Sequence, residues 1–220
     1  MTLADGGSPP QDRLTSGPRV PALALVLVLV ALVGAGAAVY LLLRPHLVFT
    51  NTLSAAVRVV VGDDAPRIVA PGAVVRVLLA RSRTMVAQWE LVRPLSADGT
   101  PMGDDVRGSS VLRGPSGTVR ASAGTRSPDH SYFAPLITNA SAQALRMTVN
   151  AGLQGALDCG CAVRPGARRV FIGYYRLYQN SSVGAYAAGV GSAVFRDLGA
   201  EVRALDGSLG LRFEDKDLRR

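Results

Sequence analysis

The sequence predicts an all-β protein: an immunoglobulin-like β-sandwich built from two related half-modules, preceded by one N-terminal transmembrane helix and followed by a short C-terminal amphipathic helix. Three observations predict this fold. Residues 20–43 carry no charge, residues 47–187 contain short alternating runs bounded by Gly, Pro, Asn and Asp, and two parts of that region echo each other. The predicted segments are a disordered cytoplasmic tail (1–19), the transmembrane helix (20–43), a first β half-module (44–93), a Gly/Ser/Asp-rich flexible insertion (94–131) and a second β half-module with the C-terminal helix (132–220).

The apolar run between Arg19 and Arg44 is long enough to anchor the chain in a lipid bilayer. At about 1.5 Å per residue, a helix over 20–43 reaches about 36 Å, whereas the hydrocarbon core is about 30 Å thick. Residues 35–37 have the small-x-small form of a cleavage site, but the apolar run is longer than a signal peptide requires, so we expect an uncleaved anchor. Gly34 and Ala38 put two small residues on one helix face, which favours a weak homodimer.

The charged residues indicate the source and the placement of the chain. It contains 23 Arg and a single Lys, an imbalance typical of a GC-rich bacterial genome. Residues 44–220 carry a net charge of +8, but the arginines are scattered among 14 acidic residues, so we predict no nucleic-acid binding. A β-rich body with two close cysteines suits an oxidising compartment. We therefore expect a single-pass cell-membrane protein with a cytoplasmic N-terminus and an extracytoplasmic C-terminal domain.

In the first half-module, alternating runs predict strands over 47–50, 56–61, 74–80 and 85–92, with turns at 62–64 and 71–72. Trp89 falls on the apolar side of the last run, where a large aromatic side chain is typical of a core. Residues 94–131 are dominated by Gly, Ser, Asp, Thr, Arg and Pro, and only 111–112 and 118–119 resemble strands. We expect a flexible linker there with at most a small hairpin.

The second half-module repeats features of the first. Strands are predicted over 136–139, 145–150, 169–175 and 183–187. Asn51 and Asn139 end similar Phe-Thr-Asn and Ile-Thr-Asn sequences, and a Pro-Gly turn follows each, at Gly72 and at Gly166. The second copy has six more residues between these points, so an insertion is required. We expect the two half-modules to pack face to face as one sandwich, with two tandem mini-domains as the alternative.

The end of the chain carries a helical pattern. Val194, Leu198, Val202 and Leu205 recur at three- and four-residue steps with charged residues between them, which predicts an amphipathic helix of about three turns. Residues 209–213 are then expected to form a last strand.

The sequence lacks the common catalytic motifs, so we expect a protein that is not an enzyme. The chain has no nucleophile-elbow, zinc-protease or phosphate-loop motif and only two histidines, His46 and His130. Cys159 and Cys161 are the exception, because two cysteines two residues apart on a strand put both sulfurs on one face. Three interpretations remain open: a local disulfide, a redox or Cu(I)-binding dithiol, and two packed thiols.

A local resemblance bears on these two cysteines. A single membrane anchor, an immunoglobulin-like domain and a Cys-x-Cys sequence shortly before Pro165-Gly166 resemble the copper chaperones that serve cytochrome oxidase assembly. The resemblance covers residues 159–166 and the general layout only. Gly160 and Ala162 stand where those proteins have Phe.

A second candidate site is a group of aromatic residues, a composition that suits a partner surface or a sugar-like ligand, although strand packing explains most of them equally well. The group comprises Phe171, Tyr174, Tyr175, Tyr178 and Tyr186. The leading hypothesis is a non-enzymatic interaction or envelope-associated protein that binds an envelope protein or polymer without a cofactor. The alternative is a Cu(I)- or thiol-handling accessory factor that uses Cys159 and Cys161.

Overall fold

The computed structural model describes residues 22–42, 44–79, 84–113, 117–126, 130–153 and 157–218. The chain divides into two compact units, Met1–Leu43 and Arg44–Arg220. The first contains one helix, and strands dominate the second, so the all-β prediction with one N-terminal apolar helix is confirmed. The predicted tail over 1–19 lies outside the described residues.

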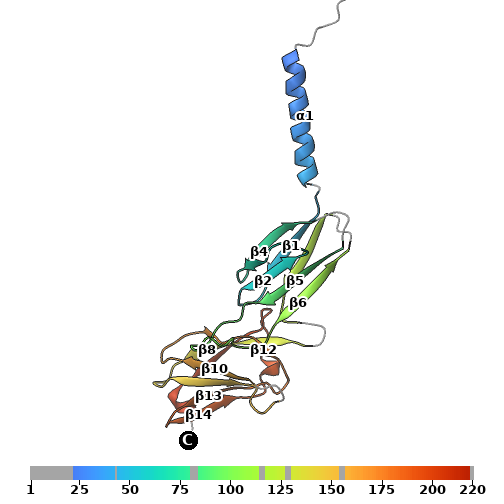
Figure 1. The fold of residues 1–220 in the computed structure, drawn as a ribbon. Coiled ribbons are helices and arrows are strands. Elements are labelled where there is room, and N and C mark those ends of the chain that lie inside the picture. Colours follow the sequence, from blue (N-terminus) through green and yellow to red (C-terminus); the bar gives the residue numbers. More distant parts are fainter. Residues whose placement is uncertain are drawn as a thin grey trace, which may run out of the picture. The chain divides into compact units, whose positions relative to one another are not determined.

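Helix α1 (Ala22–Leu42) is built almost entirely from Leu, Val and Ala, with no acidic residue in its first turn and no basic residue in its last. Its 21 residues give a length of about 31 Å, close to the thickness of a hydrocarbon core. The stretch Leu23–Tyr40 is unburied and is long and apolar enough to cross a membrane (Figure 1).

The first module, defined as residues 44–126, consists of two sheets. One has the order β4-β1-β7 and the other β3-β2-β5-β6. The strands are β1 (His46–Asn51), β2 (Val57–Val61), β3 (Arg67–Val69), β4 (Val74–Leu78), β5 (Met85–Leu91), β6 (Arg107–Leu112) and β7 (Thr118–Ala123). Strand β1 pairs antiparallel with β4 and parallel with β7. Alternate residues of β1, β2 and β5 are buried in one apolar cluster between the sheets, so period-two patterning forms the core.

The second module, defined as residues 130–218, repeats this arrangement. Its strands are β8 (Tyr132–Asn139), β9 (Leu145–Val149), β10 (Leu157–Val163), β11 (Val170–Phe171), β12 (Tyr175–Arg176), β13 (Val183–Ala187), β14 (Gly191–Phe195) and β15 (Ser208–Phe213). Strand β8 pairs antiparallel with β11 and parallel with β15, as β1 does with β4 and β7. The order β10-β9-β13-β14 repeats β3-β2-β5-β6. The internal repeat is therefore a repeat of whole topology.

The two modules do not share their sheets. In the described part of the chain, every strand pairs within its own module, and most residues of each apolar cluster come from one module. The sheets therefore differ from the expected single sandwich of two half-modules, because each module has two sheets of its own within the one compact unit Arg44–Arg220. The reason is that β6 and β7 give the first module seven strands, enough to enclose a core of its own.

A buried asparagine organises the same corner in each module. The Nδ2 atom of Asn51 donates to the carbonyl oxygens of Ala55 at 2.8 Å and Val69 at 3.0 Å. That of Asn139 donates to the equivalent oxygens of Gln143 at 2.7 Å and Val163 at 2.8 Å. Both asparagine side chains are fully buried. The repeated Thr-Asn sequence therefore supplies an equivalent asparagine in each module, and its side-chain hydrogen bonds connect the first strand to the third.

The six extra residues of the second module lie in its β9–β10 hairpin. Pairing between β2 and β3 runs without interruption, whereas β10 shifts register against β9 between Asp158 and Ala162. This shift accommodates two extra residues as a bulge, and the longer turn after β9 accommodates the other four.

The prediction of a flexible insertion over 94–131 is wrong, because this segment contains strands β6 and β7. They pair with β5 and β1 respectively, so they belong to opposite sheets and do not form the expected hairpin. Their sequences, Arg-Gly-Ser-Ser-Val-Leu and Thr-Val-Arg-Ala-Ser-Ala, resemble a loop because both are edge strands. Only their last residues, Leu112 and Ala123, are buried in the core, so the sequences of these two strands show no apolar alternation.

The predicted C-terminal amphipathic helix is also wrong. Residues 191–195 form strand β14, and only a 3-10 turn, η1 (Leu198–Ala200), follows (Figure 1). Leu198 is buried, but Val194 is 51% and Leu205 93% exposed, so the three- and four-residue spacing does not define one buried face. The predicted last strand is confirmed as β15. A second 3-10 turn, η2 (Asp215–Asp217), follows it, and there Asp215 accepts a hydrogen bond from the Ala142 N–H at 3.0 Å.

Candidate functional site

Tyr174 joins the two modules. It lies in the second module, yet its fully buried ring belongs to the apolar cluster of the first. Its hydroxyl accepts a hydrogen bond from the Ser54 N–H at 2.8 Å and donates one to the Asp206 carbonyl oxygen at 2.8 Å. Burial raises the pKa of Tyr174, so the hydroxyl keeps the proton that it donates. The side chain is therefore a fixed connection between the modules.

Asp206 and Ser54 extend this connection. The Ser54 hydroxyl donates to the Asp206 carboxylate at 2.6 Å, and the Ser208 N–H donates to its other oxygen at 3.0 Å. Partial burial opposes ionisation of Asp206, but these hydrogen bonds outweigh it and lower its pKa. The carboxylate is consequently ionised and held in place beside the junction.

Backbone contacts fix the junction from a second direction. The Asp104 N–H donates to the Tyr174 carbonyl oxygen at 2.7 Å, and the Asp104 carboxylate accepts from the Arg176 N–H at 2.7 Å. Gly103 and Gly173 lie against each other, and a Cβ atom on Gly103 would come within 2.6 Å of the Tyr174 carbonyl oxygen. Only glycine allows the two chains to approach this closely. Together these contacts tie the two modules into the one compact unit Arg44–Arg220.

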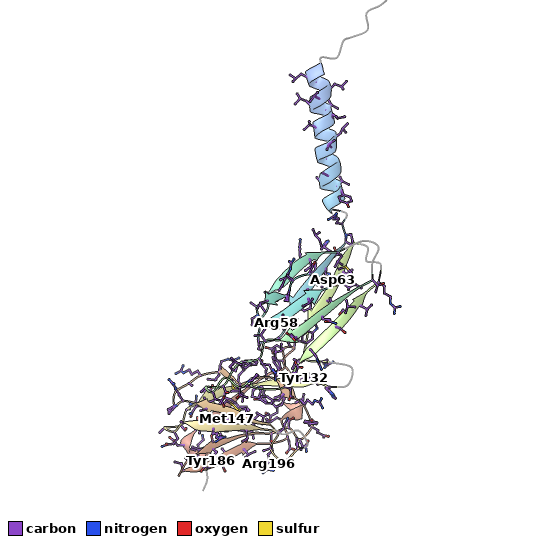
Figure 2. The ribbon with its side chains drawn as sticks, in the orientation of Figure 1. Arg58, Asp63, Tyr132, Met147, Tyr186 and Arg196 are labelled. Carbon is purple, nitrogen blue, oxygen red and sulfur yellow. A yellow bond between two sulfur atoms is a disulfide. The ribbon has the colours of Figure 1, made fainter. Side chains whose placement is uncertain are left out.

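A groove of about 730 Å³ lies beside this junction. It is bordered by β6 and the end of β7 from the first module, and by the start of β8 and the segment after η1 from the second. Its lining consists of Trp89, Arg107, Gly108, Ser109, Ser110, Ser122, Gly124, Thr125, Arg126, Ser131, Tyr132, Leu177, Val202, Arg203, Ala204, Leu205 and Gly207. Figure 2 labels Tyr132 at this border between the modules.

The charged groups that line the groove are all cationic. Arg107, Arg126 and Arg203 are exposed, and no carboxylate belongs to the lining among the described residues. Arg107 makes one long contact, 3.8 Å, with Asp105, and this pair is solvent-exposed and therefore weak. Five serine and threonine hydroxyls stand between the arginines. The groove therefore favours negatively charged groups that accept hydrogen bonds.

The two aromatic residues that line the groove are almost fully buried. The Trp89 indole lies over Gly108 on the neighbouring strand, where a Cβ atom would come within 2.7 Å of the ring. Trp89 and Tyr132 are each only 8% exposed. They support the lining residues but offer almost no ring face on which a sugar could stack.

The edge of β6 carries unused backbone groups. The Leu91 N–H donates to the Val106 carbonyl oxygen, which sets the alternation along the antiparallel pair: Gly108 and Ser110 face β5, whereas Arg107 and Ser109 face outward. No described residue bonds to the outward N–H and carbonyl groups of these two residues. The groove therefore exposes an open strand edge beside three arginines.

The structure joins Cys159 and Cys161, the first predicted site, in a disulfide with their Cα atoms 5.1 Å apart. The pair lies in the β10 bulge, where Gly160 has a φ of +59°, a conformation that glycine adopts readily. Both cysteines are 6% exposed and belong to the core of the second module. The Cys159 sulfur lies 3.2 Å from the Met147 carbonyl oxygen. The described residues contain no group of three or more His, Cys, Asp or Glu that could hold a metal.

The structure does not bring the predicted aromatic residues together on one surface. Tyr174 and Tyr175 are buried, and Phe171 is half-buried against Tyr174 with ring centroids 5.5 Å apart. Tyr178 is 36% exposed and Tyr186 53% exposed. Figure 2 shows Tyr186 well separated from Tyr132. The sequence cluster therefore divides into core residues and isolated surface residues.

Sequence reasoning missed the groove. Arg107, Arg126 and Arg203 are far apart in the chain and look like scattered charges. The only sequence signal for the groove was the position of Arg107 in β6 and of Arg126 after β7. That signal was hidden because the sequences of both strands resemble a loop. Comparison with protein-family models, curated proteins and solved structures found no match.

Proposed function

We propose that the chain is a bacterial single-pass membrane protein that presents two immunoglobulin-like β-modules outside the cytoplasm as a non-enzymatic interaction unit. The observation that carries the proposal is the disulfide between Cys159 and Cys161, in a chain that also has an apolar helix long enough to span a membrane. Disulfides persist in oxidising compartments and are rare in the cytosol. An anchor before a disulfide-bonded unit therefore supports an N-in, C-out orientation.

The strand orders support an immunoglobulin-like comparison for each module. The order β3-β2-β5-β6 corresponds to the C′CFG sheet of immunoglobulin variable domains, and β1 with β4 corresponds to their B and E strands. Strand β7 departs from that pattern because it pairs parallel with β1.

The junction supports an interaction role. A partner surface formed by two modules keeps its shape only when the modules are held together, because ordering them on binding would weaken affinity. Tyr174, Asp206 and Asp104 hold them together through side-chain and backbone hydrogen bonds. Among the described residues that line the groove, the charged groups are arginines, and serine and threonine hydroxyls lie beside them.

Reporter fusions test the orientation. A periplasmic-type reporter such as alkaline phosphatase, fused after Arg220, should be active, and a cytoplasmic reporter at the same position should not. The matched control places both reporters before Met1, where the pattern should reverse. Activity of the C-terminal fusion in the cytoplasm alone would refute the proposal.

The disulfide gives a second, independent test in cells. A maleimide reagent applied to denatured protein trapped with acid should label neither cysteine unless a reductant is added first. The variant with both Cys159→Ser and Cys161→Ser defines the background. Full labelling without reductant would contradict placement in an oxidising compartment.

A further inference from the structure

We propose that the junction groove binds an acidic, extended segment of a partner protein, which adds as a strand to the free edge of β6. This proposal deepens the proposed interaction role by naming the partner chemistry and the site. Three observations support it: an open strand edge, a lining whose charges are all positive, and aromatic side chains that are covered.

The edge of β6 can supply the main-chain hydrogen bonds. Arg107 and Ser109 direct their N–H and carbonyl groups away from β5, and both residues line the groove, with Val111 next along the same edge. An extended peptide placed there would continue the order β3-β2-β5-β6 by one strand. Since a strand rises about 3.4 Å per residue, the six residues of β6 match a partner segment of about six residues.

The charges of the groove select an acidic segment. Arg107 comes from β6 itself, Arg126 follows β7, and Arg203 follows η1. They border the groove from three different segments of both modules. Guanidinium groups bind carboxylates through two parallel hydrogen bonds, so aspartate or glutamate side chains of an added strand would find partners on each side.

The covered aromatic residues favour a peptide over a glycan. Sugars are commonly recognised through an exposed aromatic face, whereas Trp89 and Tyr132 are each only 8% exposed. An open strand edge offers little to a sugar chain but matches the repeat of a polypeptide backbone.

The second module provides a matched control edge. Strand β14 occupies the place of β6, and Ala193 pairs with Ala185 as Gly108 pairs with Trp89. Val194 is thus the counterpart of Ser109, but Ser192 stands where the first module has Arg107. Because β14 lacks the arginine, we expect the acidic segment to choose β6.

The experiment uses the full-length protein in phosphatidylcholine nanodiscs, probed with an array of peptides about eight residues long. The array compares acidic peptides with neutral and basic peptides of matched hydrophobicity. We expect acidic, strand-forming peptides to bind best, with affinity that falls as salt rises. Hydrogen exchange at the amides of Arg107 and Ser109 should slow on binding, because those amides become bonded.

Three variants separate the backbone and charge contributions. Ser109→Pro removes an outward N–H on an edge strand, where proline is tolerated, and should weaken binding at least about tenfold. Ser109→Ala keeps the N–H and removes only one of the five lining hydroxyls, so it should weaken binding much less than Ser109→Pro does. Val194→Pro on the control edge should bind normally. Arg203→Glu should weaken binding by about tenfold, whereas Arg196→Glu, which Figure 2 places away from Tyr132, should not.

Specific results would overturn the proposal. Acidic peptides that bind no better than neutral ones exclude it. Binding of polyphosphate with an affinity that Ser109→Pro leaves unchanged would show a polyanion site instead, and concentration-dependent self-association lost in Ser109→Pro would show that a second copy occupies the edge. The assay uses purified protein, so its failure leaves the membrane orientation to be judged by the reporter fusions.

Discussion

Tyr174 and Tyr186 show how much a residue's neighbours in the sequence conceal. Both belong to the same aromatic cluster, yet one is fully buried between the modules and the other is 53% exposed. The sequence shows that each is a tyrosine near a strand, but not which face of which module it meets. Predicting the junction would have required the long-range contact with Ser54, 120 residues away. By contrast, the equivalence of Asn51 and Asn139 was visible in the sequence. Each module needs a buried asparagine at the end of its first strand to make the same hydrogen bonds, so the local sequence repeats.

The Tyr174 hydroxyl is expected to contribute to stability. Tyr174→Phe leaves the Ser54 N–H and the Asp206 carbonyl oxygen without this partner, which should lower the free energy of unfolding by about 1–3 kcal/mol. Tyr186→Phe is the control and should change it by less than about 0.5 kcal/mol. Urea unfolding followed by circular dichroism measures both. Equal effects of the two variants would show that Tyr174 is not the connection described.

Asp206 should make the junction sensitive to acid. Its pKa is lowered in the folded protein, so its stabilising contribution is complete above the unfolded pKa of about 4 and is lost as the pH falls through the lower, folded value. Asp206→Asn should therefore flatten the decline in stability below about pH 4. The measurement is the melting temperature against pH for both proteins. Parallel curves for the two proteins would show that Asp206 does not cause the loss of stability in acid.

At the scale of elements, strands with apolar alternation could be predicted and strands without it could not. Strand β5 shows Met85, Ala87, Trp89 and Leu91 on one side, and its bounds agree with the prediction to one residue. Strands β6 and β7 contain mainly small and polar residues because each has a neighbour on one side only. Strand β14 was mistaken for a helix because Val194 and Leu198 happen to be four residues apart.

The Trp89–Gly108 pair should be intolerant of any side chain at position 108. Gly108→Ala places a Cβ atom 2.7 Å from the indole and should destabilise the protein by about 1–3 kcal/mol. Gly210→Ala in β15 is the matched control, because nothing lies within 4 Å of its new Cβ atom, and it should be neutral or slightly stabilising. Thermal unfolding compares them, and a neutral Gly108→Ala would contradict the close packing of Trp89.

The bulge that contains Cys159 and Cys161 should depend only modestly on its disulfide. A bond that spans so few residues restricts the unfolded chain little, so replacing both cysteines with Ser should cost about 1–2 kcal/mol. The same variant tests the Cu(I) alternative, which requires buried sulfurs to become accessible after reduction. We expect reduced protein to bind no more Cu(I) than the double Ser variant. Binding near one equivalent that the variant lacks would restore the metal hypothesis.

At the scale of the whole molecule, the duplication was predictable, but its consequence for the fold was not. The Asn and Pro-Gly echoes located β1 and β8 and the turns that precede β4 and β11. Whether the copies share sheets depends on the number of strands in each, and that number was hidden in residues 94–131. The groove could not be predicted either, because it forms only where two complete modules meet.

The C-terminal turn should matter most to the second module. Removing residues 214–220 leaves the Ala142 N–H without the Asp215 carboxylate and should raise hydrogen exchange in the Ala140–Gln143 corner while the first module stays protected. Asp215→Asn keeps an acceptor at this position and should behave almost as the native chain does. Equal loss of protection in both modules would argue against a local role for the turn.

The Ser54 and Ala142 amides occupy the same place in the repeat, and different groups satisfy them. The following module supplies the Tyr174 hydroxyl to the first amide, and the end of the chain supplies the Asp215 carboxylate to the second. The protein is thus built like a short polymer of two repeating units, with one linkage between them and a carboxylate that caps the equivalent amide of the second unit. In an engineered chain, a tyrosine from an added module could replace the Asp215 carboxylate at the Ala142 amide, so the same corner can serve either as a cap or as a linkage.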